Sequence, residues 1–246
     1  MRFGIIGPSE DEITPFIEEM SNKEITNLAM LTFHSGKYEN VEVVALYCGV
    51  CKVNAAIATQ ILIDKFNVTH IIVTGVAGAI DKVLKIGDTV ISTEIAYHDV
   101  DEGILTEYHP WMESVYFRTD RNLLELSREV VENNQFAQNV YFGKVVTGEA
   151  FISESGRTEI ISKYNPLCVD METASIAHVC YANTIPFLAV RSITDTEEAS
   201  GIEVFEDNCV SASHNSIYFV KKLLESLKNK EILYERKPHF SEVRFL

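Results

Sequence analysis

Carboxylate side chains that follow predicted strands are the residues of this sequence best suited to chemistry. They are Glu10, Asp11, Glu12, Glu149, Asp170, Glu172 and Asp195. A single acid after a strand is more often a helix cap, but several acids in one confined site push one another's pKa values apart. One group can then act as an acid while another acts as a base. That division of labour suits cleavage of a glycosidic bond, in which one group protonates the departing fragment and another activates water.

The predicted strands and helices alternate along the chain, and their arrangement decides whether these carboxylates meet. Apolar, β-branched runs predict strands over residues 2–7, 28–34, 41–47, 68–74, 89–97, 140–147, 167–171 and 187–193. Helices are predicted from about residue 9 and over residues 52–66, 122–132, 157–163, 172–182 and 205–227. This alternation predicts an α/β fold, a single-domain three-layer α/β/α sandwich around a mixed, mostly parallel twisted sheet.

In such a sheet, ligands bind beyond the carboxyl ends of the strands. The rule gathers segments that lie far apart in the sequence, namely residues 7–12, 75–78, 148–152, 170–172 and 194–195. The stretch over residues 98–120 has no clear periodicity, and a loop of that length is typical of a lid or a subunit contact.

Two of the predicted helices carry more detailed expectations. Ser9 and the acidic residues after it suit a helix N-terminus, whereas Pro15 predicts that this helix starts late or kinks. In the helix over residues 52–66, one apolar face is expected, made of Val53, Ala56, Ile57, Ile61 and Leu62.

Composition argues against several other classes of function. The chain has 246 residues and a net charge of −15, which disfavours binding to nucleic acid or to an anionic membrane. Its apolar stretches are too short to span a bilayer and no signal-peptide pattern is seen, so a cytoplasmic protein is expected. The five cysteines are widely spaced and do not indicate a disulfide framework. The seven histidines lack metal-ligand spacing and motifs for ATP or dinucleotides are missing, so neither a metal nor another cofactor is expected.

A series of short motifs accompanies the carboxylates. They are Gly4-Ile5-Ile6-Gly7, Glu10-Asp11-Glu12, Thr74-Gly75-Val76-Ala77-Gly78, Ile86-Gly87-Asp88, Tyr97-His98-Asp99, Gly148-Glu149-Ala150-Phe151-Ile152, Asp170-Met171-Glu172-Thr173-Ala174 and Arg191-Ser192-Ile193-Thr194-Asp195. In order and spacing they resemble the 5′-methylthioadenosine/S-adenosylhomocysteine nucleosidases of the nucleoside phosphorylase superfamily. The resemblance covers residues 2–227. It implies one nucleoside phosphorylase-like domain over residues 1–227, followed by a C-terminal tail over residues 228–246 whose role it does not explain.

The resemblance implies hydrolysis of the N-glycosidic bond of 5′-methylthioadenosine or S-adenosylhomocysteine, with release of adenine and the thioribose product and without a cofactor. Glu12 would orient and deprotonate the attacking water, with Arg191 nearby. Asp195 would donate a proton toward N7 of adenine and hydrogen-bond its exocyclic amine. The family forms dimers, so we expect a homodimer in which the loop over residues 98–120 lies near the neighbouring subunit's site.

The resemblance also implies a set of contacts to a purine nucleoside. Phe151 would stack on the purine, and the backbone of Ile152 would read its edge. Glu172 would accept hydrogen bonds from the ribose hydroxyls, and Met171 would lie under the sugar. Phe205 would help to line the pocket for the 5′ substituent.

Three positions depart from the family pattern. Val76, in the expected substrate pocket, stands where a serine is common, and Asp170 replaces a glutamate. Ser9 stands where a methionine often lines the pocket for the sulfur. These changes leave the 5′ group less defined than the bond that is broken, so another 5′-substituted adenosine, such as an aminofutalosine, is an alternative substrate.

Two other functions compete with hydrolysis. A purine nucleoside phosphorylase needs cations and hydroxyls to hold phosphate. Val73 and Val76 offer neither, and Glu12 would repel phosphate. A nucleoside-binding module without turnover is the second alternative, and only Val76 and Asp170 hint at it.

Overall fold

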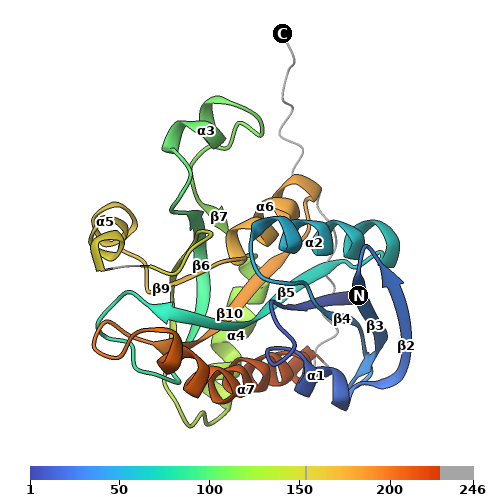
Figure 1. Ribbon diagram of the computed structural model, residues 1–246. Helices are drawn as coiled ribbons and strands as arrows, with labels where there is room; N and C mark the ends of the chain where they lie inside the picture. Colours follow the sequence, from blue (N-terminus) through green and yellow to red (C-terminus); the bar gives the residue numbers. More distant parts are fainter. Residues whose placement is uncertain (153, 228–246) are drawn as a thin grey trace.

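The computed structural model describes residues 1–152 and 154–227. The strands are β1 (Arg2–Gly7), β2 (Ser21–Leu28), β3 (Leu31–Tyr38), β4 (Val41–Tyr47), β5 (His70–Ala79), β6 (Thr89–Tyr97), β7 (Phe117–Arg118), β8 (Val140–Thr147), β9 (Cys168–Asp170) and β10 (Phe187–Asp195). The helices are α1 (Thr14–Glu19), α2 (Lys52–Phe66), α3 (Glu102–Glu107), α4 (Arg121–Asn133), α5 (Glu154–Tyr164), α6 (Thr173–Asn183) and α7 (Ile202–Leu227). Figure 1 shows their arrangement.

A mixed sheet runs through the middle of the domain. At its centre, β1 lies parallel to both β4 and β5, with Ile5 opposite Ala45 and Ile72. Beyond β4 the sheet continues antiparallel through β3 and β2. On the other side, β5 pairs with both β10 and β9. The further pairings of β10 with β6, β6 with β8 and β8 with β9 close this half of the sheet into a ring. The ring brings the ends of β5, β9 and β10 together.

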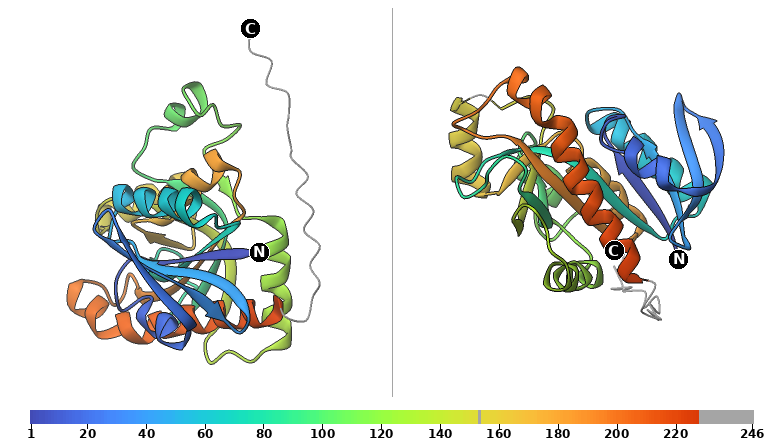
Figure 2. Two further views of the ribbon diagram at one scale, coloured as in Figure 1. Left: turned by 90° about the vertical axis from the view of Figure 1, so that its right-hand side faces the viewer. Right: turned by 90° about the horizontal axis from the view of Figure 1, so that it is seen from below.

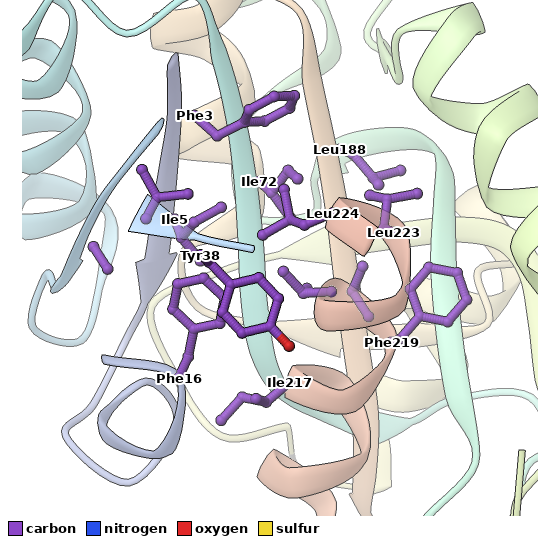
Figure 3. Close-up of a cluster of buried hydrophobic side chains, with 14 of the residues drawn as sticks. Phe3, Ile5, Phe16, Tyr38, Ile72, Leu188, Ile217, Phe219, Leu223 and Leu224 are labelled. Atoms are coloured by element: carbon purple, nitrogen blue, oxygen red, sulfur yellow. The ribbon is translucent and has the colours of Figure 1, made fainter. Parts of the chain in front are cut away.

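Helices cover both faces of the sheet, which confirms the predicted α/β/α sandwich. α2 and α6 lie on one face, while α1, α4 and α7 lie on the other (Figures 1 and 2). Each face has its own apolar core, because each layer must bury an apolar surface to be stable. Phe3, Phe16 and Phe219 belong to the core against α7 (Figure 3). Leu62 and Ile176 belong to the core beneath α2 and α6.

Many elements lie where the sequence predicts them. β6, β8 and α2 have the predicted bounds. α1 begins only at Thr14, with Pro15 in its first turn, so the late start is confirmed. Ser9 lies outside this helix, and its predicted role as a helix cap is wrong. β5 and β10 run further than predicted, to Ala79 and Asp195, because the two strands remain paired as far as Gly78 and β5 then pairs with β9 at Ala79.

Two other features differ from expectation. β2 was not predicted, since its sequence alternates too little to indicate a strand and all its residues are exposed. The predicted face of α2 is confirmed only in part. Leu62 is buried as expected, but Ala55 and Ala58 also face the core, whereas Val53 and Ile57 are 67% and 44% exposed. α2 is apolar on several sides, so periodicity alone did not identify the side that packs.

The stretch over residues 98–120 contains short elements. α3 and β7 interrupt it, and α3 projects away from the sheet in Figure 1.

Within the part of the chain that the structure describes, none of the helices combines the length and apolar character needed to cross a membrane. The predicted tail over residues 228–246 lies outside the described residues.

Candidate active site

A buried arginine lies at the centre of the strand ends. Arg191 lies on β10 opposite Gly75 of β5, and its side chain is fully buried. Its Nε lies 2.8 Å from Asp170 Oδ2, its Nη2 lies 3.4 Å from Glu172 Oε2, and its Nη1 lies 3.8 Å from Glu12 Oε1. A buried charge is tolerated only when it is paired, so the guanidinium allows three carboxylates to remain in the interior.

Glu12 lies in the loop after β1, with both carboxylate oxygens engaged. Oε1 accepts a hydrogen bond from the backbone N–H of Val76 at 2.8 Å. Oε2 accepts from the hydroxyl of Ser9 at 2.6 Å and from its backbone N–H at 3.0 Å. Burial raises the pKa of Glu12 above that of an exposed glutamate, whereas Arg191 and these hydrogen bonds lower it. Gly75 lies against this pair, and a Cβ there would collide with Glu12 Oε1 and Arg191 Nη1.

Asp170 joins the end of β9 to the start of α6. Its Oδ1 accepts from the hydroxyl of Thr147 at 2.6 Å and from the backbone N–H of Thr173 at 3.1 Å. Its Oδ2 pairs with Arg191 and with the hydroxyl of Thr173. The aspartate at this position therefore accepts a backbone N–H in the first turn of α6 and orients the guanidinium of Arg191.

Glu172 lies beside Arg191 and faces α2. Its Oε1 accepts a hydrogen bond from the backbone N–H of Cys51 at 2.9 Å. Burial raises the pKa of Glu172 to about 7; Arg191 opposes that shift, and the charges of Asp170 and Glu12 add to it. Cys51 has φ 79° and ψ 166°, a backbone conformation that favours glycine. Met171, next to Glu172 in the chain, is half-buried.

Asp195 ends β10, lies beside Gly78 of β5 and is only partly buried. The hydroxyl of Thr194 lies 2.8 Å from its Oδ1. Burial raises the pKa of Asp195, whereas Thr194 and the charge of Arg157 lower it. The Arg157 guanidinium is buried and donates to the carbonyl of Ala79 at 2.5 Å. A carboxyl group with a raised pKa keeps its proton closer to neutral pH, which suits a proton donor.

Aromatic and aliphatic side chains pack next to the polar cluster. Phe151, in the loop after β8, is 62% exposed and meets the ring of Phe205 edge-on, with 5.7 Å between the centroids. Phe205, in the first turns of α7, packs against a cluster that contains the buried Val76 of β5. The partly buried side chain of Ile152 packs against a core cluster that contains Ile80.

The structure thus brings Glu12, Asp170 and Glu172 together around Arg191. Asp195 lies apart from this group, and Glu10, Asp11 and Glu149 are exposed. The expected aromatic pair packs beside Val76, whose backbone N–H donates to Glu12. Sequence reasoning missed the contacts of Ser9, Cys51 and Arg157. Arg157 lies in the short helix α5 and belongs to no motif. Ser9 has no signal either, because its contact depends on the conformation of a loop. Among the described residues, no group of three His, Cys, Asp or Glu side chains could hold a metal ion.

Comparisons with known proteins agree with this architecture. The chain matches the model of the phosphorylase superfamily over residues 2–225. It is 38% identical to a 5′-methylthioadenosine/S-adenosylhomocysteine nucleosidase from an Exiguobacterium species, over 93% of this chain and 99% of that protein. The nucleosidase from Colwellia psychrerythraea 34H, solved in complex with adenine, has a TM-score of 0.84 and 33% identity, covering 92% of this chain and 96% of that one. A futalosine hydrolase of Helicobacter pylori has a TM-score of 0.83 and 29% identity, with coverages of 92% and 98%.

These likenesses extend over nearly the whole described domain and confirm the expected nucleoside phosphorylase-like fold. They also match the resemblance carried by the motifs. The chain belongs to the 5′-methylthioadenosine/S-adenosylhomocysteine nucleosidase family of the phosphorylase superfamily.

Proposed function

We propose that this chain hydrolyses the N-glycosidic bond of 5′-methylthioadenosine and S-adenosylhomocysteine, releasing adenine and the corresponding thioribose. The observation that carries the proposal is the division of the carboxylates at one edge of the sheet. Glu12 and Glu172 share the buried Arg191, while Asp195 lies apart from Arg191, beside Gly78, with a raised pKa. One side of the site thus suits activation of water, and the other suits protonation of the leaving base.

In this mechanism, Glu12 is the base. Its carboxylate accepts a proton from the attacking water, and its pKa, raised by burial, keeps it basic enough for that transfer. Arg191 holds Glu12 and Glu172 near each other and offsets their charge. Glu172 accepts hydrogen bonds from the ribose hydroxyls, and Met171 lies under the sugar.

Asp195 is the acid on the purine side. It donates a proton toward N7 of adenine, so that the base departs as a neutral molecule. Phe151 stacks on the purine, and the backbone of Ile152 contacts its edge. Phe205 and Val76 line the side of the pocket toward the 5′ group, which is supported by their mutual packing.

Water is favoured over phosphate as the nucleophile because of the charge around Arg191. The guanidinium faces three carboxylates, so a phosphate dianion entering there would meet excess negative charge. The neighbouring side chain of Val76 has no hydroxyl with which to hold phosphate. A purine nucleoside phosphorylase needs the opposite arrangement.

We also propose a homodimer whose interface includes α2 and the loop over residues 98–120. Large apolar side chains are exposed on both: Val53 and Ile57 on α2, and Tyr108 and Trp111 in the loop. Exposed apolar surface of this kind is typical of protein interfaces. The loop would then lie near the neighbouring subunit's site. The expected cytoplasmic location rests on the sequence alone and stays a prediction.

A substrate panel and one variant test the function. Methylthioadenosine, adenosylhomocysteine and an aminofutalosine differ in the 5′ group, and release of adenine from each is measured. The third substrate is included because a futalosine hydrolase has a closely similar fold. Asp195→Asn should lower kcat by about 100-fold or more while ligand binding persists, and the exposed Asp64→Asn should not. Wild-type protein that binds these nucleosides but releases no base would show a binding module instead.

A further inference from the structure

The hydroxyl of Ser9 makes an unusually direct contact with the proposed base. Ser9 Oγ lies 2.6 Å from Glu12 Oε2, and the backbone N–H of Ser9 donates to the same oxygen at 3.0 Å. A hydrogen bond to an ionised acceptor is shorter and about twice as strong as one between neutral groups. Oε2 is thus held by two donors from one residue.

The other oxygen of Glu12 has weaker support. Oε1 accepts the backbone N–H of Val76 at 2.8 Å, and Arg191 Nη1 lies 3.8 Å away, beyond hydrogen-bond distance. The guanidinium makes its closer contacts with Asp170 and Thr173. Val76 contributes no side-chain donor, so Ser9 supplies the only side-chain hydroxyl on Glu12 among the described residues.

The contact is not needed to build the neighbouring helix. α1 begins at Thr14, five residues after Ser9 in the chain, and its start is closed by backbone bonds from Ile13 and Thr14 to the carbonyl of Glu10. Ser9 caps none of these groups. Its hydroxyl is directed at the carboxylate of Glu12 within the site.

We propose that Ser9 is a positioning residue for Glu12, whose hydroxyl keeps the buried carboxylate ionised and fixed in one orientation for activating water. A buried carboxylate without sufficient donors takes up a proton and ceases to be a base. Donation from Ser9 favours the ionised form and so extends activity toward lower pH. The proposal rests on the proposed hydrolysis, because it assigns Ser9 a role through Glu12.

Kinetics test the role in Ser9→Ala, Ser9→Thr and the control Ser211→Ala. Ser211 lies on the exposed side of α7, where its hydroxyl bonds to the carbonyl of Asn208. kcat and KM for methylthioadenosine are measured from about pH 5 to about pH 9. For Ser9→Ala we expect the acidic limb of kcat/KM to move to higher pH. At the low end of the range the rate should fall by about tenfold or more, with a smaller loss at the optimum. Ser9→Thr, which keeps the hydroxyl, should restore the wild-type limb, and Ser211→Ala should not move it.

A uniform loss of kcat at every pH in Ser9→Ala, with the limb unmoved, would show a merely structural role and overturn the proposal. A second readout does not depend on turnover. Carboxyl carbon NMR titration of Glu12 in the ligand-free protein should show a higher pKa in Ser9→Ala than in wild type. An unchanged titration contradicts the proposal for Ser9. Wild-type protein that releases no adenine contradicts the hydrolase function instead, so the two failures are distinguishable.

Discussion

Removing the charge of Arg191 should strongly destabilise the domain. Arg191→Met keeps much of the side-chain volume but leaves Asp170, Glu172 and Glu12 buried without their shared cation. Breaking a buried ion pair from one side costs about 3–5 kcal/mol. Domains are stable by about 5–15 kcal/mol, so the variant should fold with a much reduced margin. At a urea slope of about 3 kcal/mol/M, the unfolding midpoint should fall by about 1–2 M.

The loss of stability in Arg191→Met should depend on pH in a defined direction. Without the guanidinium, the pKa values of the buried Glu12 and Glu172, which burial already raises, rise further above those of the unfolded chain. The native state then binds more protons than the unfolded state, so the stability of the variant falls as pH rises. Its deficit relative to wild type should be largest near pH 8 and smaller near pH 5, by about 1 kcal/mol or more.

Urea unfolding followed by circular dichroism at both pH values measures this effect. The matched control is Arg121→Met, since Arg121 pairs with Glu125 on the surface of α4. An exposed pair of this kind contributes about 0.3–0.5 kcal/mol, so the control should unfold close to wild type at either pH. A loss below about 1 kcal/mol in Arg191→Met, or a deficit that grows as pH falls, would refute the electrostatic account of the site.

Three further variants probe individual contacts. Gly75→Ala places a Cβ against Glu12 and Arg191, so turnover should fall by about 100-fold or more. The control is Gly201→Ala, which is also at positive φ but has open space around it. It should keep turnover, and its free energy of unfolding in urea should fall by about 1 kcal/mol. Arg157→Met removes a charge that lowers the pKa of Asp195, so the basic limb of kcat/KM should move to higher pH. An unmoved limb would show that Arg157 does not influence the proton on Asp195. Phe151→Ala should raise KM by about tenfold through lost stacking, with little change in the unfolding midpoint because the ring is exposed; an unchanged KM would remove Phe151 from the purine site.

The parts of the fold that depend on local pattern could be predicted from the sequence. β6 and β8 are apolar runs between clear breaks, and both have the predicted bounds. β2 could not be predicted, because an exposed edge strand has no buried face to impose alternation. The packed side of α2 was predicted only in part. Leu62 is buried, but Val53 and Ile57 are exposed although they are as apolar as the residues that face the core.

The residues of the site likewise fall into those that the sequence predicts and those that it does not. Glu12, Asp170 and Asp195 follow strands, so the topology of an α/β sheet is enough to bring them to one edge. Contacts made by loops depend on exact backbone geometry. The bond from Ser9 to Glu12 and the one from Cys51 to Glu172 belong to this class. No periodicity or motif encodes them.

The most direct test of the central claim is the fate of the sugar when methylthioadenosine is cleaved with and without phosphate. In phosphate-free buffer, the protein should release adenine and a thioribose with a free reducing end. Added phosphate should change neither the rate nor the product. Adenine release that requires phosphate, with a sugar 1-phosphate as the second product, would contradict the account.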